Sequence, residues 1–350
     1  MENNQKKNEI NMIIKINEND INKDIYFLDD IDKEINPNPH IEYKSEHNNL
    51  KEMNKKNTKL YINDIEYKFD KFFVFEKPGN YRIKIVLNNL IKNCSFMFYN
   101  SLNLICIDMS NFNSSKTTNM DRMFSGCENL IELNLTNFDT KNVTTMRSLF
   151  YDCKKLTNID LSSFNTENVN DMRCMFSGLE NLQKINLSHF DTKNVTNMRQ
   201  MFWCCKNLKK IDISNFNTSK VTIMENMFCG CENLYFLNLT NFDTKNCKDI
   251  SQIFWDCKNL LKVDLSSFDT SNAIDMNSMF NNCESLIYID ISNFKLENAT
   301  NISFLFSGCI NLCYVSLPIE EIKIHENIEK SHMFLDCINL PKDIVNDIDK

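Results

Sequence analysis

Hydrophobic residues recur along most of this chain with a period of 26 residues. Two columns of phenylalanine and one of cysteine, each holding a fixed place in the period, carry the pattern. Such self-similarity is typical of proteins built from stacked repeats. The first column holds Phe112, Phe138, Phe164, Phe190, Phe216, Phe242, Phe268 and Phe294. The second holds Phe98, Phe124, Phe150, Phe176, Phe202, Phe228, Phe254, Phe280 and Phe306. The cysteines are Cys127, Cys153, Cys205, Cys231, Cys257, Cys283 and Cys309, with Leu179 in the remaining repeat.

One repeat, residues 130–153, shows what each position is expected to do. It opens with L-x-x-L-x-L, whose alternation predicts a short strand with one inward face. Phe138 follows, and Asp139 and Thr140 are turn formers. Thr144 is placed to cap a helix. The apolar residues after it fall at i, i+3, i+4 and i+7, which predicts one face of a short helix. They are Met146, Leu149, Phe150 and Cys153. Because no unit can cover its own apolar face, neighbouring units must stack.

The repeats resemble a known family. The phrases LNLTNFDTKNVTTMRSLFYDC and INLSHFDTKNVTNMRQMFWCC are similar to the BspA-like leucine-rich repeats, the 26-residue repeat of bacterial surface proteins. The similarity covers about residues 95–340. It implies a right-handed leucine-rich solenoid of the α/β class with a role in binding or adhesion, and it brings no shared catalytic residues.

The ends of the chain depart from the repeat. Residues 1–11 are polar and are expected to be disordered, and the polar residues 29–58 are expected to contain a loop. Residues 12–92 contain short β-branched runs with a Pro78-Gly79-Asn80 turn, which predicts a small mostly-β domain capping the solenoid. The solenoid is expected over 93–317. Pro318 interrupts the register, so 318–350 are expected to form an atypical C-terminal capping unit.

Charge and hydropathy narrow the classes of partner. The net charge is -8 with a pI near 5.3, which argues against nucleic acid as a partner. No apolar run is long enough to cross a membrane, so membrane insertion is not expected. The N-terminal residues lack the apolar stretch of a signal peptide, which favours a cytoplasmic location. The BspA-like resemblance favours the alternative, the cell surface.

The cysteines and histidines do not form a recognisable metal site. Metal ligands gather around one point, whereas these cysteines recur along a line, as expected for a ladder of buried thiols. The five histidines show no ligand spacing. Cys204, beside Cys205 but outside the column, is the one thiol for which reactivity is an alternative. The sequence has no motif of a known catalytic site or nucleotide loop, so we expect no enzyme activity, no cofactor and no metal.

A column in the middle of each strand alternates between asparagine and aspartate. Stacked aspartates would repel, and an intervening asparagine amide can donate to its neighbours, so we expect a structural ladder. Duplication of a double repeat would explain the alternation equally well. The column reads Asn134, Asp160, Asn186, Asp212, Asn238, Asp264 and Asp290.

A second column, two residues earlier, is the main candidate for partner binding. In a leucine-rich strand this position faces the concave side, where a large aromatic side chain has no core to enter. Phe236, Tyr288 and Tyr314 are therefore candidate contact residues, with Lys210 and Lys262 beside them. Scattered surface apolar residues, or cover of Tyr314 by the C-terminal unit, are the alternatives.

A third column is rich in arginine, in a chain that otherwise uses lysine. Arg147, Arg173 and Arg199 follow the methionine of successive repeats, between Asp121 and Glu225. Three guanidinium groups in a row are suited to binding carboxylate or phosphate groups. The alternative is a solvated stripe whose ends are neutralised by the two acids.

Taken together, these patterns predict a non-enzymatic interaction module that binds a protein partner on the surface of its repeats. A cell-surface or secreted adhesin of the BspA-like type is the alternative. Neither the partner nor the oligomeric state follows from the residues.

Overall fold

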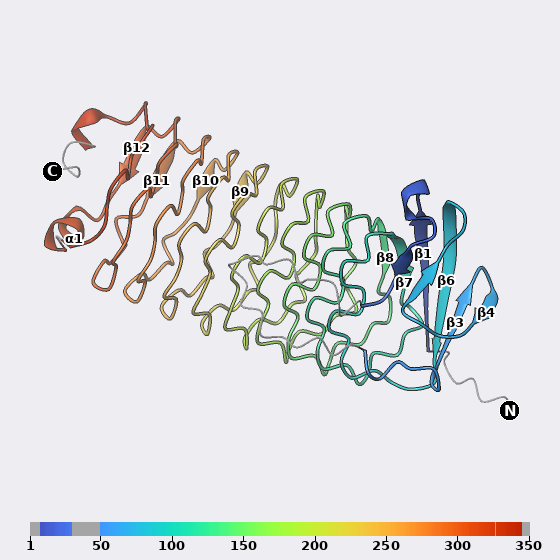
Figure 1. Cartoon of the computed structure of the whole chain (residues 1–350). Helices are drawn as coiled ribbons and strands as arrows, with labels where there is room; N and C mark the ends of the chain where they lie inside the picture. The colour runs from blue at the N-terminus through green and yellow to red at the C-terminus, as the bar shows by residue number, and fades with distance from the viewer. Residues whose placement is uncertain (1–7, 30–49, 326, 345–350) are drawn as a thin grey trace. The chain divides into compact units, whose positions relative to one another are not determined.

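The computed structural model describes residues 8–29, 50–325 and 327–344. The chain divides into two compact units, residues 1–168 (unit 1) and 169–350 (unit 2), each with its own internal contacts. Figure 1 traces the successive repeats along the chain. The boundaries predicted from sequence at residues 92 and 317 mark changes of pattern and stay predictions.

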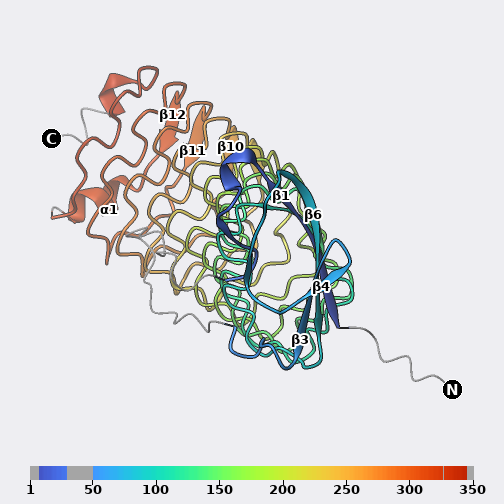
Figure 2. The same ribbon diagram turned by 45° about the vertical axis from the view of Figure 1, so that its right-hand side comes forward.

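Unit 1 is organised around a six-stranded sheet in the order β4-β3-β6-β1-β7-β8. β1 is antiparallel to both its neighbours, β6 and β7, whereas β7 and β8 are parallel and belong to successive repeats. Figure 2 views the unit from the side of β6, β3 and β4. The strands are β1 (Glu9–Ile16), β3 (Thr58–Ile62), β4 (Ile65–Tyr67), β6 (Gly79–Leu87), β7 (Leu104–Asp108) and β8 (Glu132–Asn134). A separate pair joins β2 (Asp24–Tyr26) to β5 (Phe72–Val74).

Alternation along the strands decides which face is buried. In β1 the side chains of Ile10, Met12, Ile14 and Ile16 are buried, while those between them are more exposed. Because successive side chains of a strand point to opposite faces, β1 presents one apolar face to the core. The prediction that residues 1–11 are disordered is wrong for residues 9–11, which this apolar alternation holds in β1. Residues 1–7, and residues 30–49 of the predicted loop, lie outside the described residues.

Unit 2 contains short parallel strands in successive repeats. β9 (Phe236–Leu237) pairs with β10 (Lys262–Val263), and β11 (Tyr288–Asp290) pairs with β12 (Tyr314–Ser316). Isolated parallel bridges continue the same spacing, for example between Asn197 and Ile223. Pairing at this constant separation places each repeat of unit 2 beside the next. The same order holds for the repeats of unit 1, where Asn119 bridges Thr145.

The predicted mixed α/β right-handed leucine-rich solenoid is wrong for this chain. The described residues are almost entirely strand and turn, and apart from a helical turn at residues 342–344 their helices are the short η1 (Glu18–Asp20) and α1 (Ile319–Ile324). In each repeat, turns occupy the place of the expected helix. Thr144 caps no helix, since its hydroxyl donates to the carbonyl of Thr118 in the preceding repeat at 3.3 Å.

The bonding of the backbone explains why the expected helix is absent. In unit 1 the amide of Met123 donates to the carbonyl of Met120, closing a tight turn. The amide of Phe124, one residue on, donates instead to Leu149 of the next repeat. Unit 2 alternates in the same way, with Met201 bonded to Met198 and Phe202 bonded across to Met227. An α-helix sends every amide to the fourth residue before it, so this alternation excludes one.

Two residues in each of these turns have positive φ, which an α-helix does not allow. In the first full repeat they are Arg122 and Gly126, with φ of 55° and 76°. The second position tolerates a left-handed backbone because Gly, Asn or Asp occupies it in most repeats. Cys204 is the exception. The residues there are Asn100, Gly126, Asp152, Gly178, Cys204, Gly230, Asp256, Asn282, Gly308 and Asp336.

Ladders of identical side chains fill the interior of each unit. Phe202 and Phe228 stack with ring centroids 5.5 Å apart, and Phe228 and Phe254 follow at 6.0 Å. The cysteine column is buried, as predicted. Each of its thiols donates to the carbonyl of a phenylalanine in the preceding repeat, as Cys231 does to Phe202 at 3.1 Å. The ladders therefore satisfy polar groups as well as filling space.

Threonine supplies a further buried ladder. The hydroxyl of Thr192 donates to the carbonyl of Asn217 at 3.0 Å, and the amide of Asn217 donates back to the same oxygen at 2.8 Å. This buried hydroxyl both donates and accepts a hydrogen bond, and it ties one repeat of unit 2 to the next. Thr140 and Asn165 make the same pair of bonds within unit 1.

Candidate partner-binding face

A band of exposed apolar side chains lies on unit 2, and we call it the aromatic face. Each of these side chains has an exposed fraction between 42% and 55%. Lys210 and Lys262 lie in the same columns and are exposed as well. The apolar members of the aromatic face are Tyr235, Phe236, Leu261, Ile287, Tyr288 and Tyr314.

Strand geometry places Phe236, Tyr288 and Tyr314 outward. Leu237 follows Phe236 and is buried, as Ile289 is after Tyr288, so each preceding aromatic ring points away from the core. Parallel register then aligns the column from repeat to repeat. Phe236 pairs with Lys210 on one side and with Lys262 on the other. Neighbouring members are therefore separated by about 4.8 Å, the spacing between paired strands.

The two tyrosines at the end of the column form a stacked pair. Tyr288 and Tyr314 are in register, with ring centroids 5.4 Å apart and planes 16° from parallel. The Tyr288 hydroxyl lies 3.4 Å from a carboxylate oxygen of Asp290. Partial desolvation and that carboxylate raise the pKa of Tyr288, so the phenol stays neutral and able to donate a hydrogen bond. The pair thus offers a broad ring surface with a polar edge.

A row of carboxylates borders the aromatic face. Hydrogen bonds from the amide and the hydroxyl of Ser292 lower the pKa of Asp290, and Ser266 does the same for Asp264. Both groups are therefore charged at neutral pH. These aspartates belong to the column that alternates between Asn and Asp, for which a ladder of side-chain amides bonded from repeat to repeat was expected. The column forms local turns instead, because the side chain of Asn238, like those of the aspartates, accepts from the backbone amide two residues later. Asparagine and aspartate serve that turn equally well.

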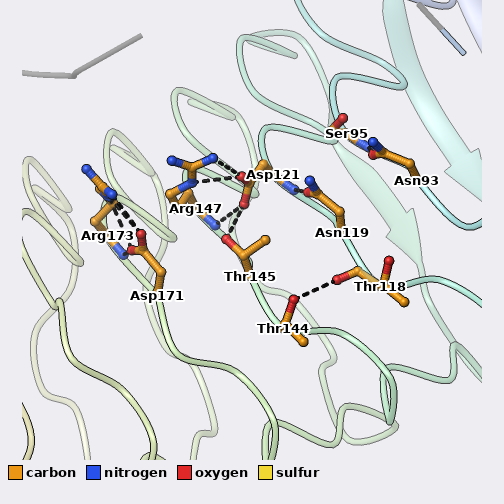
Figure 3. A network of polar contacts seen from close by, with 10 residues as sticks. All are labelled: Asn93, Ser95, Thr118, Asn119, Asp121, Thr144, Thr145, Arg147, Asp171 and Arg173. Atoms are coloured by element: carbon orange, nitrogen blue, oxygen red, sulfur yellow. Dashed lines mark hydrogen bonds and ion pairs between the residues drawn. The ribbon is translucent and has the colours of Figure 1, made fainter. Parts of the chain in front are cut away.

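Two of the three predicted arginines, Arg147 and Arg173, are bonded to carboxylates in Figure 3. In unit 1 the Nε of Arg147 donates to Asp121 at 2.7 Å, and the Asp121 side chain is buried. Asp121 also accepts from the Thr145 hydroxyl. Asp121 therefore pairs with the Arg147 guanidinium within unit 1. The role of Arg147 in partner binding stays a prediction.

The arginines of unit 2 are also paired with carboxylates. Arg173 donates to Asp171 at 2.9 Å, and Arg199 donates to Glu225 at 3.0 Å. Burial raises the pKa of Glu225, and the Arg199 charge opposes that rise. A ligand anion would have to displace these acids, so Arg173 and Arg199 are weaker candidates than the aromatic face. Their part in binding stays a prediction.

Sequence reasoning pointed to Phe236, Tyr288, Tyr314, Lys210 and Lys262, and the structure brings them together in one unit. Sequence reasoning missed the exposed apolar residues that come one position before members of this column and widen the face. The available signal was a second column in which large apolar residues replace polar ones in the last repeats. Those residues are Tyr235, Leu261 and Ile287.

The described residues hold no group of three or more His, Cys, Asp or Glu side chains suited to a metal ion. In that part of the chain, the helices are also too short and too polar to span a bilayer. Cys204 is half-buried and Cys313 is exposed. Neither lies in the cysteine column.

Comparison with known proteins gives a family but no relative of known activity. No curated protein matches this chain. One matching solved structure is described as "Crystal structure of TLR13-ssRNA13 complex", with 15% identity, a TM-score of 0.18, and coverage of 62% of this chain and 42% of that one. This chain thus matches less than half the length of that protein, and so weak a likeness supports no argument about fold or ligand.

The family "Mycoplasma protein of unknown function, DUF285" matches four overlapping stretches of the chain, residues 63–186, 157–239, 176–286 and 230–347. Repeated matching of one family agrees with the parallel pairing of successive repeats within each unit, so this is a repeat protein. The BspA-like resemblance is not confirmed by this match. Since the four matches together span most of its length, the chain belongs to the family described as "Mycoplasma protein of unknown function, DUF285".

Proposed function

We propose that this chain is a non-enzymatic binding protein that holds a protein partner on the aromatic face of unit 2. The observation that carries the proposal is the row of six large apolar side chains, exposed by 42% to 55%, on consecutive repeats. Isolated exposed apolar residues are common on soluble proteins, but a contiguous band of them typically marks an interaction surface. Aromatic side chains are also enriched among the residues that dominate binding energy.

The make-up of the face favours protein over nucleic acid. Its cations, Lys210 and Lys262, are matched by the charged Asp264 and Asp290 along its border. A nucleic-acid surface needs an excess of positive charge to neutralise phosphates, and the net charge of the chain is -8. An apolar centre with a mixed polar rim is instead the usual composition of a protein interface.

We expect the substitution of three aromatic anchors to abolish most of the binding. In a triple Phe236→Ala, Tyr288→Ala, Tyr314→Ala variant, affinity for a partner captured with the parent protein should fall at least about a hundredfold, because one desolvated anchor is typically worth about 2 kcal/mol. Isothermal titration of both proteins against that partner measures the loss. Equal affinities of the parent and a folded variant would rule out this face.

Two controls separate binding from folding and from charge steering. Each exposed anchor should change the free energy of unfolding by no more than roughly 0.5 kcal/mol, so the triple variant should remain folded. A Lys210→Ala, Lys262→Ala variant should mainly lower the association rate and weaken its salt dependence, since solvated charges steer encounter more than they hold a complex.

An adhesin is the alternative function, and the BspA-like pattern of the repeats favours it. The same face would then contact a host or neighbouring cell. Limited proteolysis of intact cells separates the two proposals. Release of peptides from this chain would support the adhesin, whereas release only after lysis would support an internal partner.

A further inference from the structure

A second open surface, not foreseen from the sequence, lies on unit 1. The outward face of β6, β1, β7 and β8 forms the floor of a hollow of about 950 Å³. Its lining residues all belong to unit 1, and the aromatic face belongs to unit 2. This hollow is therefore a separate feature, and we call it the sheet groove.

Strand register arranges the floor of the sheet groove in rows that cross the strands. In one row Arg82 of β6 is opposite Ile13 of β1, which is opposite Cys106 of β7, which in turn pairs with Glu132 of β8. The cation is thus at one end and the anion at the other, with an apolar side chain and a thiol between them. Burial and the Glu132 carboxylate raise the pKa of Cys106, so this thiol is neutral at physiological pH.

The next row repeats the same order of charges. Lys84 of β6 is opposite Asn11 of β1, which is opposite Asp108 of β7. The Lys84 ammonium lies 4.7 Å from the ring centre of Tyr61 on β3. Both rows therefore run from a positively charged side chain on β6 to a negatively charged one on β7 or β8. A ligand must present its own charges in the complementary order.

The charged ends of the groove remain accessible. Arg82 pairs with Asp64 at 3.0 Å, but both side chains are more than 70% exposed, and an ion pair in that setting is worth little. Asn11 makes no side-chain hydrogen bond to any described residue, and the same is true of Asn158 at the far end of the hollow. Free carboxamides can donate to and accept from a peptide backbone.

Dimensions decide which ligand fits this arrangement. Three steps between paired strands separate Arg82 from Glu132, about 14 Å at 4.8 Å a step. In an extended chain, side chains four residues apart lie on the same face and are separated by about 13 Å. The side chain midway between them also faces the floor, over Ile13 and Cys106.

From this match we infer that the sheet groove binds an extended peptide segment of a partner protein with the pattern acidic–x–apolar–x–basic. The acidic side chain lies at Arg82 and Lys84, the apolar one over Ile13, and the basic one at Glu132 and Asp108. The free carboxamides of the groove bond to the backbone of the segment.

An array of synthetic seven-residue peptides tests the spacing. Each peptide has a central Val, one Glu and one Lys, placed one to five residues apart in both orders, with Thr elsewhere, and the full-length protein is the probe. Binding should peak at a separation of four residues and should weaken as salt is raised. Binding that does not depend on separation, or no binding to any peptide at millimolar concentration, would overturn the inference.

Charge reversal tests the position of the site on the protein. Glu132→Lys and Arg82→Glu should each weaken the best peptide at least tenfold, and the milder Glu132→Gln should weaken it less. Glu297→Lys, which makes the same charge change on an exposed residue of unit 2, is the matched control and should bind as the parent does. Equal affinity in Glu132→Lys and Glu297→Lys would contradict binding in the groove.

Discussion

Between pH 9 and pH 10 the free energy of unfolding of this chain should fall by about 1.4 kcal/mol for each buried thiol that has a raised pKa in the folded state. Burial raises the pKa of each of these groups in the folded state, to about 12 for Cys94 and about 11 for Cys337. Six members of the cysteine column behave in the same way, because their thiols lie in the apolar interior. The column members with raised pKa are Cys153, Cys205, Cys231, Cys257, Cys283 and Cys309.

The sign follows from which state holds the proton. Above the ordinary thiol pKa of about 8.5 the unfolded chain releases its protons, while the folded chain keeps them. The stabilisation is thus fully present below pH 8.5 and is lost as the pH rises toward the folded-state values. Because several thiols lose this stabilisation over the same pH range, the free energy of unfolding should fall steeply with rising pH.

Urea unfolding at a series of pH values measures this slope. A Cys231→Ala, Cys257→Ala variant should lose stability more slowly, by about 2.8 kcal/mol per pH unit, which is twice the value for one thiol. Cys313→Ala removes an exposed thiol and is the matched control, with an unchanged slope. The ladder of neutral buried thiols would be refuted by identical slopes in the parent and the double variant.

Phe228→Ala should destabilise unit 2 by about 3–5 kcal/mol. Phe228 is fully buried and lies between Phe202 and Phe254 in the stack. Truncation removes its contacts on both sides and leaves a cavity that the neighbouring repeats cannot fill, because each is fixed by its own ladder bonds. Both urea unfolding and the thermal midpoint should report the loss.

Phe236→Ala is the control for this substitution, since it removes the same side chain from an exposed position eight residues along the chain. It should change stability by roughly 0.5 kcal/mol or less. If the two variants were destabilised equally, the assignment of one phenylalanine to the interior and the other to the surface would be wrong.

Periodicity alone predicted the stacking of repeats and the buried columns. Because Phe228 and Cys231 recur at one fixed separation, and each apolar unit needs a neighbour, the ladders follow from the sequence. Periodicity failed for the helix. An apolar spacing of i, i+3, i+4 and i+7 also fits a run of tight turns, in which alternate amides bond to the next repeat. The overlooked signal was the Gly, Asp or Asn before most column positions, as at Gly126 and Asp152, where positive φ is required.

The candidate surfaces differ in how far the sequence could foresee them. Exposure of Phe236 and Tyr288 follows from the strand alternation, because the next residue in each case is apolar and buried. The pairing of Arg147 with Asp121 was harder to foresee, since the partner comes from another repeat and its burial depends on packing. The sheet groove was not predictable at all, because it requires β1 to insert between β6 and β7, a non-local pairing with no sequence motif.

The most direct test of the central claim is photo-crosslinking from the aromatic face in the cells that produce the protein. A benzophenone amino acid replaces Tyr288 in one variant and the exposed Glu297, also in unit 2, in the other. We expect a discrete protein adduct from position 288 that is absent or much weaker from position 297. The same adducts from both positions, or none from position 288, would contradict partner binding on this face.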